Sequence, residues 1–333
     1  MIDFKTIEYN SEKNEVTVLD QTKLPEEEAY LTLTKAEDIY QAIKNMNVRG
    51  APLIGVTAAY GVVLASRTGS QNEIQKACDL IRSARPTAVN LSWAIGRMEK
   101  KLAQSRNPFS ELLAEAKKIE AEDKNACIAM GKLGATLIAD NANIMVHCNA
   151  GALATSGIGT ALGIIYTAKE QGKRFSVFSS ETRPLLQGAR LTSWELTKNG
   201  VDTYTICDNM VATFMPRMKL VLVGADRIAS NGDVANKIGT KGLAIISDYY
   251  KVPFYVAAPL STFDFTVASG TQIPIEERTE DEIRKFNERC IVAPPAKICN
   301  PAFDITPAEL VSGIITERCI IDRPHGKNIA KML

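Results

Sequence analysis

The sequence predicts an α/β protein in which a smaller, mainly helical region with a short antiparallel sheet precedes a parallel, doubly wound sheet. Three observations support this fold class. Apolar and polar residues alternate near the N-terminus, helical periodicity dominates after Thr34, and short apolar strands alternate with helices from Asn143 onwards. We therefore expect two domains, an N-terminal one at 1–125 and a C-terminal one at 126–333.

In the N-terminal region, the alternating segments Thr6–Tyr9 and Glu15–Leu19 are separated by polar turns and predict an antiparallel meander. Apolar residues at helical spacing then predict four helices, followed by a long charged helix that crosses towards the second half of the chain. These five helices are expected at Ala36–Met46, Pro52–Ser66, Asn72–Ser83, Val89–Ala103 and Ser110–Ala139.

In the C-terminal region, short apolar runs predict strands, and helices are expected between them. The predicted strands are Ile144–Cys148, Phe175–Ser179, Thr203–Ile206, Leu220–Gly224, Phe254–Ala257 and Ile314–Thr316. The predicted helices include Ala161–Gln171, Leu185–Asn199 and Gly239–Tyr250. Ligands of such sheets bind beyond the carboxyl ends of the strands, where Cys148 and Asp226 lie. A thiol and an acid at that edge indicate proton-transfer chemistry on a small molecule.

The composition excludes several functional classes. The 333 residues include 39 Lys and Arg and 38 Asp and Glu. The net charge is therefore too small for an overall electrostatic field that would attract nucleic acid or an anionic membrane. No apolar run reaches the ~18 residues of a membrane span, and residues 1–5 lack the order of a signal peptide. Seven cysteines without a CxxC pair are typical of reduced thiols, and two histidines cannot form a multi-histidine metal site. We expect a soluble cytoplasmic protein.

Several segments offer anion-binding chemistry at predicted helix starts. Arg49 and Gly50 precede Pro52, where free backbone amides can hold a phosphate, although an ordinary helix–helix turn fits this pattern equally well. Asn236 and Lys237 are expected at another helix start, where amides and an ammonium group can act together. Weaker candidates, for which packing or solvation is an equal explanation, are Arg85, Asn90, Trp93, Arg183, Gln187 and Arg190.

Three further motifs fail when their spacing is tested. Residues 157–163 form GxGxxxG well beyond Cys148, whereas a dinucleotide fingerprint has GxGxxG directly at the strand-to-helix turn. Residues 231–233 lack the regular ladder and terminal glutamate of a calcium loop. Adjacent strand residues point to opposite faces, so His147 is expected to pack rather than to pair with Cys148.

Six ordered blocks of the sequence resemble the methylthioribose-1-phosphate isomerase family, and the resemblance continues to NPAFDITPAELVSGIITE (300–317). The blocks are VRGAPLIG (48–55), RPTAVNLSWA (85–94), HCNAGALAT (147–155), ETRPLLQGARLTSWEL (181–196), GADRIASNGDVANKIGT (224–240) and PFYVAAPLSTFD (253–264). The resemblance implies an isomerase of methionine salvage that opens a furanose 1-phosphate to a 1-phosphoketose. It also implies a Rossmann-like catalytic domain, a homodimer, and a reaction without metal or organic cofactor.

The resemblance also implies the roles of particular residues. Cys148 and Asp226 correspond to the catalytic pair, with Asp226 protonating the ring oxygen and Cys148 acting at C1 and C2 of the sugar. Whether hydrogen moves as a proton or as a hydride stays open. The phosphate site corresponds to Arg49, Gly50, Ala51, Arg85, Gln187, Asn236 and Lys237.

The sequence alone leaves alternative functions open. 5-Deoxyribose 1-phosphate differs from the methylthio substrate by an apolar group, which a pocket discriminates by only about 1–3 kcal/mol. Ribose 1,5-bisphosphate would need a second basic subsite, for which the sequence shows no further cation cluster. A non-catalytic alternative is a sugar-phosphate- or nucleotide-binding subunit like the regulatory subunits of the initiation-factor 2B complex, which share this fold. The presence of both Cys148 and Asp226 favours an enzyme.

Overall fold

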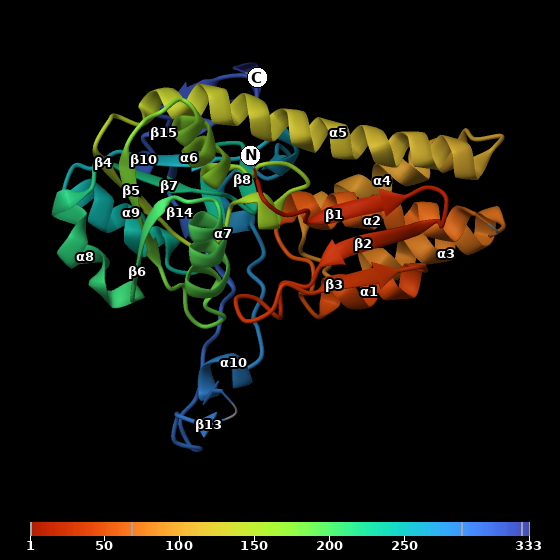
Figure 1. Ribbon diagram of the computed structural model, residues 1–333, viewed down its shortest axis with the longest axis horizontal. Helices are drawn as coiled ribbons and strands as arrows, with labels where there is room; N and C mark the ends of the chain where they lie inside the picture. The colour runs from red at the N-terminus through yellow and green to blue at the C-terminus, as the bar shows by residue number, and fades with distance from the viewer. Residues whose placement is uncertain (1, 68, 288, 328, 333) are drawn as a thin grey trace.

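The computed structural model describes residues 2–67, 69–287, 289–327 and 329–332. An N-terminal helical part and a C-terminal part built on a large sheet lie side by side along the longest axis of the molecule (Figure 1). The long helix α5 (Pro108–Gly134) runs along both parts. Residue 125, the predicted domain boundary, therefore falls inside a continuous helix.

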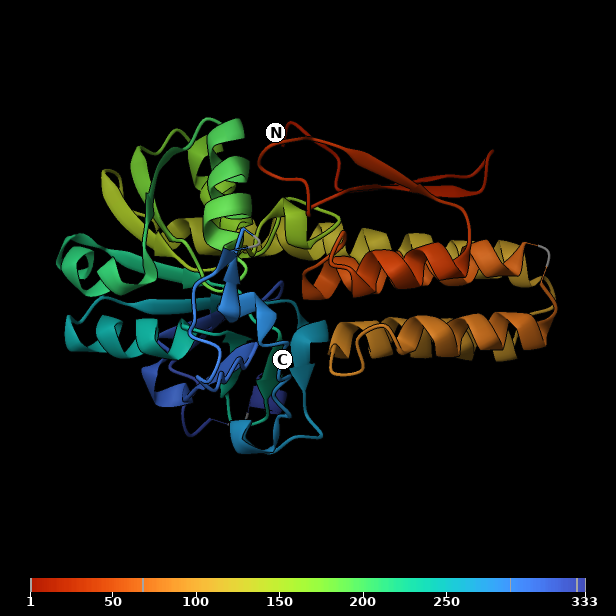
Figure 2. The same ribbon diagram turned by 90° about the horizontal axis from the view of Figure 1, so that it is seen from below.

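The N-terminus forms the predicted antiparallel meander, with strand order β1-β2-β3. Its register pairs Ile7 with Val18 and Val16 with Leu33, and all four of these side chains are buried in one core cluster. The sheet lies along the outer side of the helices (Figure 2). The strands are β1 (Ile7–Asn10), β2 (Glu15–Leu19) and β3 (Tyr30–Leu33).

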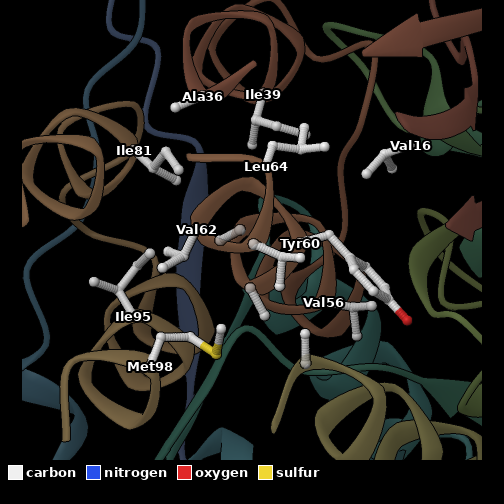
Figure 3. Packing of buried hydrophobic residues seen from close by; sticks show 14 of the residues in the cluster. Val16, Ala36, Ile39, Val56, Tyr60, Val62, Leu64, Ile81, Ile95 and Met98 are labelled. Atoms are coloured by element: carbon white, nitrogen blue, oxygen red, sulfur yellow. The ribbon is translucent and has the colours of Figure 1, made fainter. Parts of the chain in front are cut away.

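Helix α2 is the centre of the N-terminal part. It is apolar around its whole circumference, as expected for a helix enclosed by other elements. Its residues Val56, Tyr60 and Val62 contact a core that includes Ile39 of α1 and Ile95 of α4 (Figure 3). Four helices occupy the predicted positions within a few residues: α1 (Ala36–Lys44), α2 (Ala51–Ser66), α3 (Gln71–Arg82) and α4 (Val89–Ala103).

The C-terminal part contains a seven-stranded sheet with the order β16-β15-β10-β7-β4-β5-β6. All neighbours are parallel except the edge strand β16, and this order is that of a doubly wound sheet. The order reverses between β4 and β7, which is where such sheets bind ligands. The strands are β4 (Ala142–Val146), β5 (Phe175–Ser180), β6 (Asp202–Ile206), β7 (Leu220–Val223), β10 (Phe254–Ala257), β15 (Gly313–Ile315) and β16 (Ile320–Asp322).

Helices cover both faces of this sheet. Ile144 and Val146 of β4 pack with residues of α5 and α6, whereas Met145 between them packs with residues of α8 and α9. This alternation follows from the period of two in a strand. The helices are α6 (Ala161–Glu170), α7 (Ser193–Lys198), α8 (Val211–Phe214) and α9 (Thr240–Tyr249).

A second, four-stranded sheet was not predicted, and it corrects the position of two site residues. Asn236 and Lys237 end a strand rather than begin a helix. This strand, β9, pairs with β8 on one side and β14 on the other, and α9 begins only after Gly239, whose φ of 103° turns the chain. The strands are β8 (Arg227–Ala229), β9 (Val234–Lys237), β11 (Phe263–Asp264) and β14 (Phe303–Thr306).

The helix predicted at Leu185–Asn199 also starts later than expected. Leu186 has a left-handed φ of 56°, a π-helical turn follows at Gly188–Thr192, and α7 continues from there. A Cβ atom at Gly188 would lie 1.7 Å from the carbonyl oxygen of Ser180, so close packing on β5 shapes this turn. Gln187 therefore belongs to the connection rather than to a helix.

The strand predicted to end at Cys148 ends at Val146 instead. Near the C-terminus, α10 (Asp281–Arg284) and the hairpin of β12 (Lys285–Phe286) and β13 (Arg289–Cys290) extend away from the body (Figure 1). Within the described ranges, no helix is long and apolar enough to cross a bilayer.

Candidate active site

One cavity at the carboxyl ends of β4 and β7 is lined by all nine residues to which the family resemblance assigns a catalytic or phosphate-binding role. The N-terminal part contributes the start of α2 and the turn before α4, and the C-terminal part contributes the rest. The cavity therefore lies between the two parts of the molecule. The nine residues are Arg49, Gly50, Ala51, Arg85, Cys148, Gln187, Asp226, Asn236 and Lys237.

Cys148 stands just beyond β4 in the left-handed conformation, with a φ of 58°. Two threonines hold its backbone there. Its N–H donates to Oγ1 of Thr182 at 2.9 Å, and its carbonyl accepts from Oγ1 of Thr192 at 2.5 Å. Burial raises the pKa of the thiol, and the nearby cations Arg49 and Lys237 oppose this rise. The site thus holds a neutral thiol beside the positive charges that would stabilise its thiolate.

Asp226 follows β7, whose four residues are all buried. Its backbone N–H donates to the carbonyl of Ala235 in β9 at 2.9 Å, which fixes the turn after the strand. Burial raises the pKa of the carboxyl group, and Lys237, Arg85 and Arg49 lower it in part. A carboxyl group with a raised pKa retains its proton closer to neutral pH and is suited to act as a general acid.

Lys237 lies close to both catalytic candidates. Its Nζ donates to the carbonyl of Ala302 at 3.0 Å and lies 4.4 Å from the centre of the Phe303 ring. Burial lowers the pKa of Lys237, whereas Cys148 and Asp226 raise it.

Arg49 and Gly50 stand at the start of α2, where the first-turn amides have no partners within the helix. Gly50 has a φ of 92°, and a Cβ atom there would lie 2.5 Å from Cα of Ala154, so glycine is required on both grounds. Arg49 crosses to the other part of the molecule. Its Nη1 donates to Oδ1 of Asn149 at 2.7 Å, and its Nη2 donates to the Asn149 carbonyl at 3.0 Å.

Among the described residues that line this cavity, two side chains keep a buried polar atom without a hydrogen-bond partner. Arg85 pairs with Glu276 through Nη2 at 3.2 Å, but its Nε has no partner. Gln187 likewise has an unpaired Oε1. Buried polar groups normally form hydrogen bonds, so these atoms indicate a polar ligand. Asn236 is buried beside them, and its Nδ2 donates to Oγ1 of Thr240 at 3.1 Å.

Some weaker candidates do not belong to the cavity. Arg190 donates to the backbone carbonyls of Gln21 and Leu24 and so fastens the N-terminal loop instead. Arg183 donates to the Pro184 carbonyl and stacks on Phe286. The outcome for Asn90 and Trp93 is similar, because both line a separate groove along α5.

His147 is a packed neighbour, as expected. Its Nε2 donates to the carbonyl of Ile238 at 2.8 Å, and its Nδ1 accepts from the Ser180 hydroxyl at 2.6 Å. Burial lowers the pKa of His147, in keeping with a neutral ring.

Sequence reasoning missed Arg278 among the residues that line the cavity. Its guanidinium group is held by Glu276 at 2.9 Å and by Glu282. It lies in a charged stretch with no helix or strand start, so no pattern marked it. The cavity also has apolar residues that the sequence did not assign, namely Met46, Leu185, Pro259 and Phe303.

The fold and the site together define a small-molecule enzyme class, in which a thiol and a carboxyl group face a cationic cavity at the reversal point of a doubly wound sheet. Among the residues described, no group of three or more His, Cys, Asp or Glu side chains could hold a metal ion.

The chain belongs to the initiation factor 2 subunit family, which it matches over residues 47–323, and within it to the methylthioribose-1-phosphate isomerases. It is 50% identical to the methylthioribose-1-phosphate isomerase of Caldicellulosiruptor saccharolyticus over 97% of this chain and 98% of that protein. Sequence relatives thus confirm the resemblance.

Solved structures confirm the fold class. The 5-methylthioribose 1-phosphate isomerase of Pyrococcus horikoshii OT3 superimposes with a TM-score of 0.89 at 40% identity, covering 98% of this chain and 95% of that one. A structure described as subunit delta of translation initiation factor eIF-2B from A. fulgidus also gives 0.89, at 39% identity and 99% coverage of both chains.

Proposed function

We propose that this protein is an aldose–ketose isomerase that converts 5-methylthio-D-ribose 1-phosphate into 5-methylthio-D-ribulose 1-phosphate in methionine salvage. The observation that carries the proposal is the presence of Cys148 and Asp226 in one cationic cavity. The near full-length similarity to enzymes with this name supports the same assignment.

The phosphate group is proposed to bind where the two parts of the molecule meet. The first-turn amides of α2, next to Gly50 and Ala51, offer donors and the positive end of a helix dipole. Arg49, Arg85 and Lys237 supply three cations for the dianion. Gln187 and Asn236 complete the set with amide groups.

The proposed chemistry begins with opening of the furanose ring. Because the phosphate on C1 blocks spontaneous opening, Asp226 delivers a proton to the ring oxygen, a role that suits its raised pKa. The bond between C1 and the ring oxygen breaks, and hydrogen then moves from C2 to C1. The C2 hydroxyl loses its proton as a ketone forms at C2, and this proton restores the acid form of Asp226. No electrons leave the substrate, so the product is an isomer. Cys148 is assigned to the reacting carbons. In an enediol route its thiolate, stabilised by Arg49 and Lys237, accepts the C2 proton and returns it to C1, and in a hydride route the thiol lies beside the migrating hydrogen.

The far end of the sugar is proposed to carry an apolar substituent. Met46 and Leu185 add apolar surface to the cavity lining, besides Phe303, whose ring lies against Lys237. A second phosphate would need a further cation in the cavity lining, and Arg278 is held there by two carboxylates, whereas Arg85 pairs with one. These contacts favour the methylthio substrate and 5-deoxyribose 1-phosphate over ribose 1,5-bisphosphate.

We further propose a cytoplasmic homodimer that needs no metal or organic cofactor and binds neither nucleic acid nor membranes. The pattern of unpaired cysteines and the neutral overall charge support this environment. We also propose that the two functional domains comprise residues 1–125 and 126–333, joined through helix α5.

Conversion of the substrate, followed by ¹³C NMR, tests the function. The carbonyl signal of a C2 ketone should appear when the purified protein meets 5-methylthioribose 1-phosphate, and kcat/KM should be compared with that for 5-deoxyribose 1-phosphate. Absence of a ketose from both substrates would contradict the isomerase proposal. Tight binding without turnover would instead favour a regulatory binding subunit.

A further inference from the structure

Glu195 is a fully buried carboxylate that lies behind the loop carrying Cys148. Four donors converge on it. Oε1 accepts from the Ala152 N–H at 2.6 Å and from the Tyr166 hydroxyl at 2.9 Å. Oε2 accepts from the Leu153 N–H at 3.2 Å and from Nδ2 of Asn149 at 3.0 Å. Because every partner donates, an ionised carboxylate satisfies the set and a neutral amide does not.

The carboxylate packs directly on the backbone of this loop. A Cβ atom at Gly151 would lie 2.0 Å from Oε1 of Glu195, so the loop passes the carboxylate at a position that only glycine can occupy. Thr192, one helical turn before Glu195, donates to the Cys148 carbonyl at 2.5 Å. The π-helical turn and α7 therefore hold both ends of the segment from Cys148 to Leu153.

The same carboxylate determines how Asn149 faces Arg49. With Nδ2 of Asn149 donating to Glu195, its Oδ1 points to Nη1 of Arg49 at 2.7 Å. The Asn149 carbonyl accepts Nη2 at 3.0 Å. The guanidinium group is thus held by two oxygens of one residue, and that residue is held by Glu195.

We propose that Glu195 is a positioning residue of the isomerase site. It holds the loop at residues 148–153 in the conformation that presents the thiol, and through Asn149 it aims the Arg49 guanidinium group at the substrate phosphate. Glu195 acts from behind the loop, and its effect reaches the substrate only through its neighbours. This inference rests on the proposed phosphate site, but its test does not depend on turnover.

The first experiment compares Glu195→Gln with Tyr166→Phe as the matched control. Glu195→Gln places an NH₂ group against backbone and side-chain donors on the loop, whereas Tyr166→Phe removes one donor from α6 and leaves Asn149 in place. The dissociation constant of inorganic phosphate should rise about tenfold or more in Glu195→Gln and change less than about twofold in Tyr166→Phe. The rate at which iodoacetamide alkylates Cys148, measured by peptide mass spectrometry, should change in Glu195→Gln alone.

A second variant tests the link from Glu195 to Arg49 through Asn149, and it can be measured even if Glu195→Gln does not fold. Asn149→Ala keeps the carboxylate and its three other donors but removes the side-chain oxygen that Arg49 contacts. It should weaken phosphate binding about tenfold, and it should have no further effect in an Arg49→Ala background, because both act through one guanidinium group.

Two results would overturn the inference. One is an unchanged phosphate affinity in folded Asn149→Ala. The other is that Asn149→Ala weakens phosphate binding as much in the Arg49→Ala protein as in the wild-type protein. If the wild-type protein binds phosphate but forms no ketose, the proposed function fails while the positioning role can still be measured.

Discussion

Cys148 and Asp226 follow two neighbouring parallel strands, β4 and β7, between which the large sheet reverses its strand order. The last residues paired across these strands are Val146 and Leu222. The chain leaves β4 towards β5 at one edge and leaves β7 towards β10 at the other, which opens space above the sheet. The thiol and the carboxyl group meet in this space because of the topology, although they are far apart in the sequence.

Replacement of either member of the pair should stop catalysis without removing the phosphate site. Cys148→Ser and Asp226→Asn should each lower kcat by about 10²–10⁴-fold, because each removes one group involved in moving hydrogen. The double variant should be little slower than the slower single one, since groups that act as a unit are not additive. Turnover by NMR and phosphate titration provide the measurements. Near-normal kcat in either variant would exclude that residue from the pair.

The buried carboxyl group of Asp226 should destabilise the folded protein at neutral pH. Burial raises the pKa of Asp226 above its ordinary value of 3.8, so the folded state binds the proton more tightly than the unfolded chain does. The resulting stabilisation is fully present below pH 3.8 and is lost as the pH rises through the folded-state pKa. Asp226→Asn should therefore have a higher Tm than the wild type at about pH 8, and the gain should shrink towards about pH 4. A Tm difference independent of pH would contradict this expectation.

Lys237 should contribute to binding more than to the chemical step. Lys237→Met keeps the aliphatic stem beside Phe303 but removes the buried ammonium group, so KM should rise about tenfold or more while kcat falls less. Lys251→Met is the control, because that lysine is exposed on the surface, where it pairs with Asp248 at 3.3 Å. Initial-rate kinetics of both variants measure the effect. Equal KM values for the two variants would argue against a phosphate contact at Lys237.

Local patterns predicted the elements whose causes are local. Val89–Ala103 and Phe254–Ala257 match the predicted bounds, because helical periodicity and a short apolar run each mark them within one segment. Asn236 and Lys237 were placed wrongly, because their strand exists through pairing with β14, far along the chain. The turn before α7 depends likewise on close packing against β5.

In the candidate site too, the sequence identified some residues and missed those whose role depends on contacts between distant segments. Resemblance to a family identified nine residues that the structure brings to one cavity. Arg278 and Glu195 were not identified, since their contacts join segments that are distant in the sequence. A charged residue in a charged stretch, or a glutamate within a helix, has no distinguishing pattern before the chain is folded.

Gly50 provides a test of the phosphate cradle that leaves all charges in place. Gly50→Ala combines a positive φ of 92° with a Cβ position 2.5 Å from Cα of Ala154, so the start of α2 must move away from the thiol loop. Gly172→Ala is the matched control, because it has a similar φ of 81° but no atom within 4 Å of its Cβ position. Both should lose about 1–2 kcal/mol of unfolding free energy from backbone strain, with a further loss at Gly50 from the contact.

The binding measurement separates the two glycine variants. Only Gly50→Ala should weaken phosphate binding, by about tenfold or more, because a displaced helix start no longer aims its amides and Arg49 at the anion. Denaturant unfolding and phosphate titration of both variants provide the comparison. If Gly50→Ala is destabilised and yet binds phosphate as the wild type does, the start of α2 is a structural turn, and the phosphate must be held by Arg85, Lys237 and the amide side chains alone.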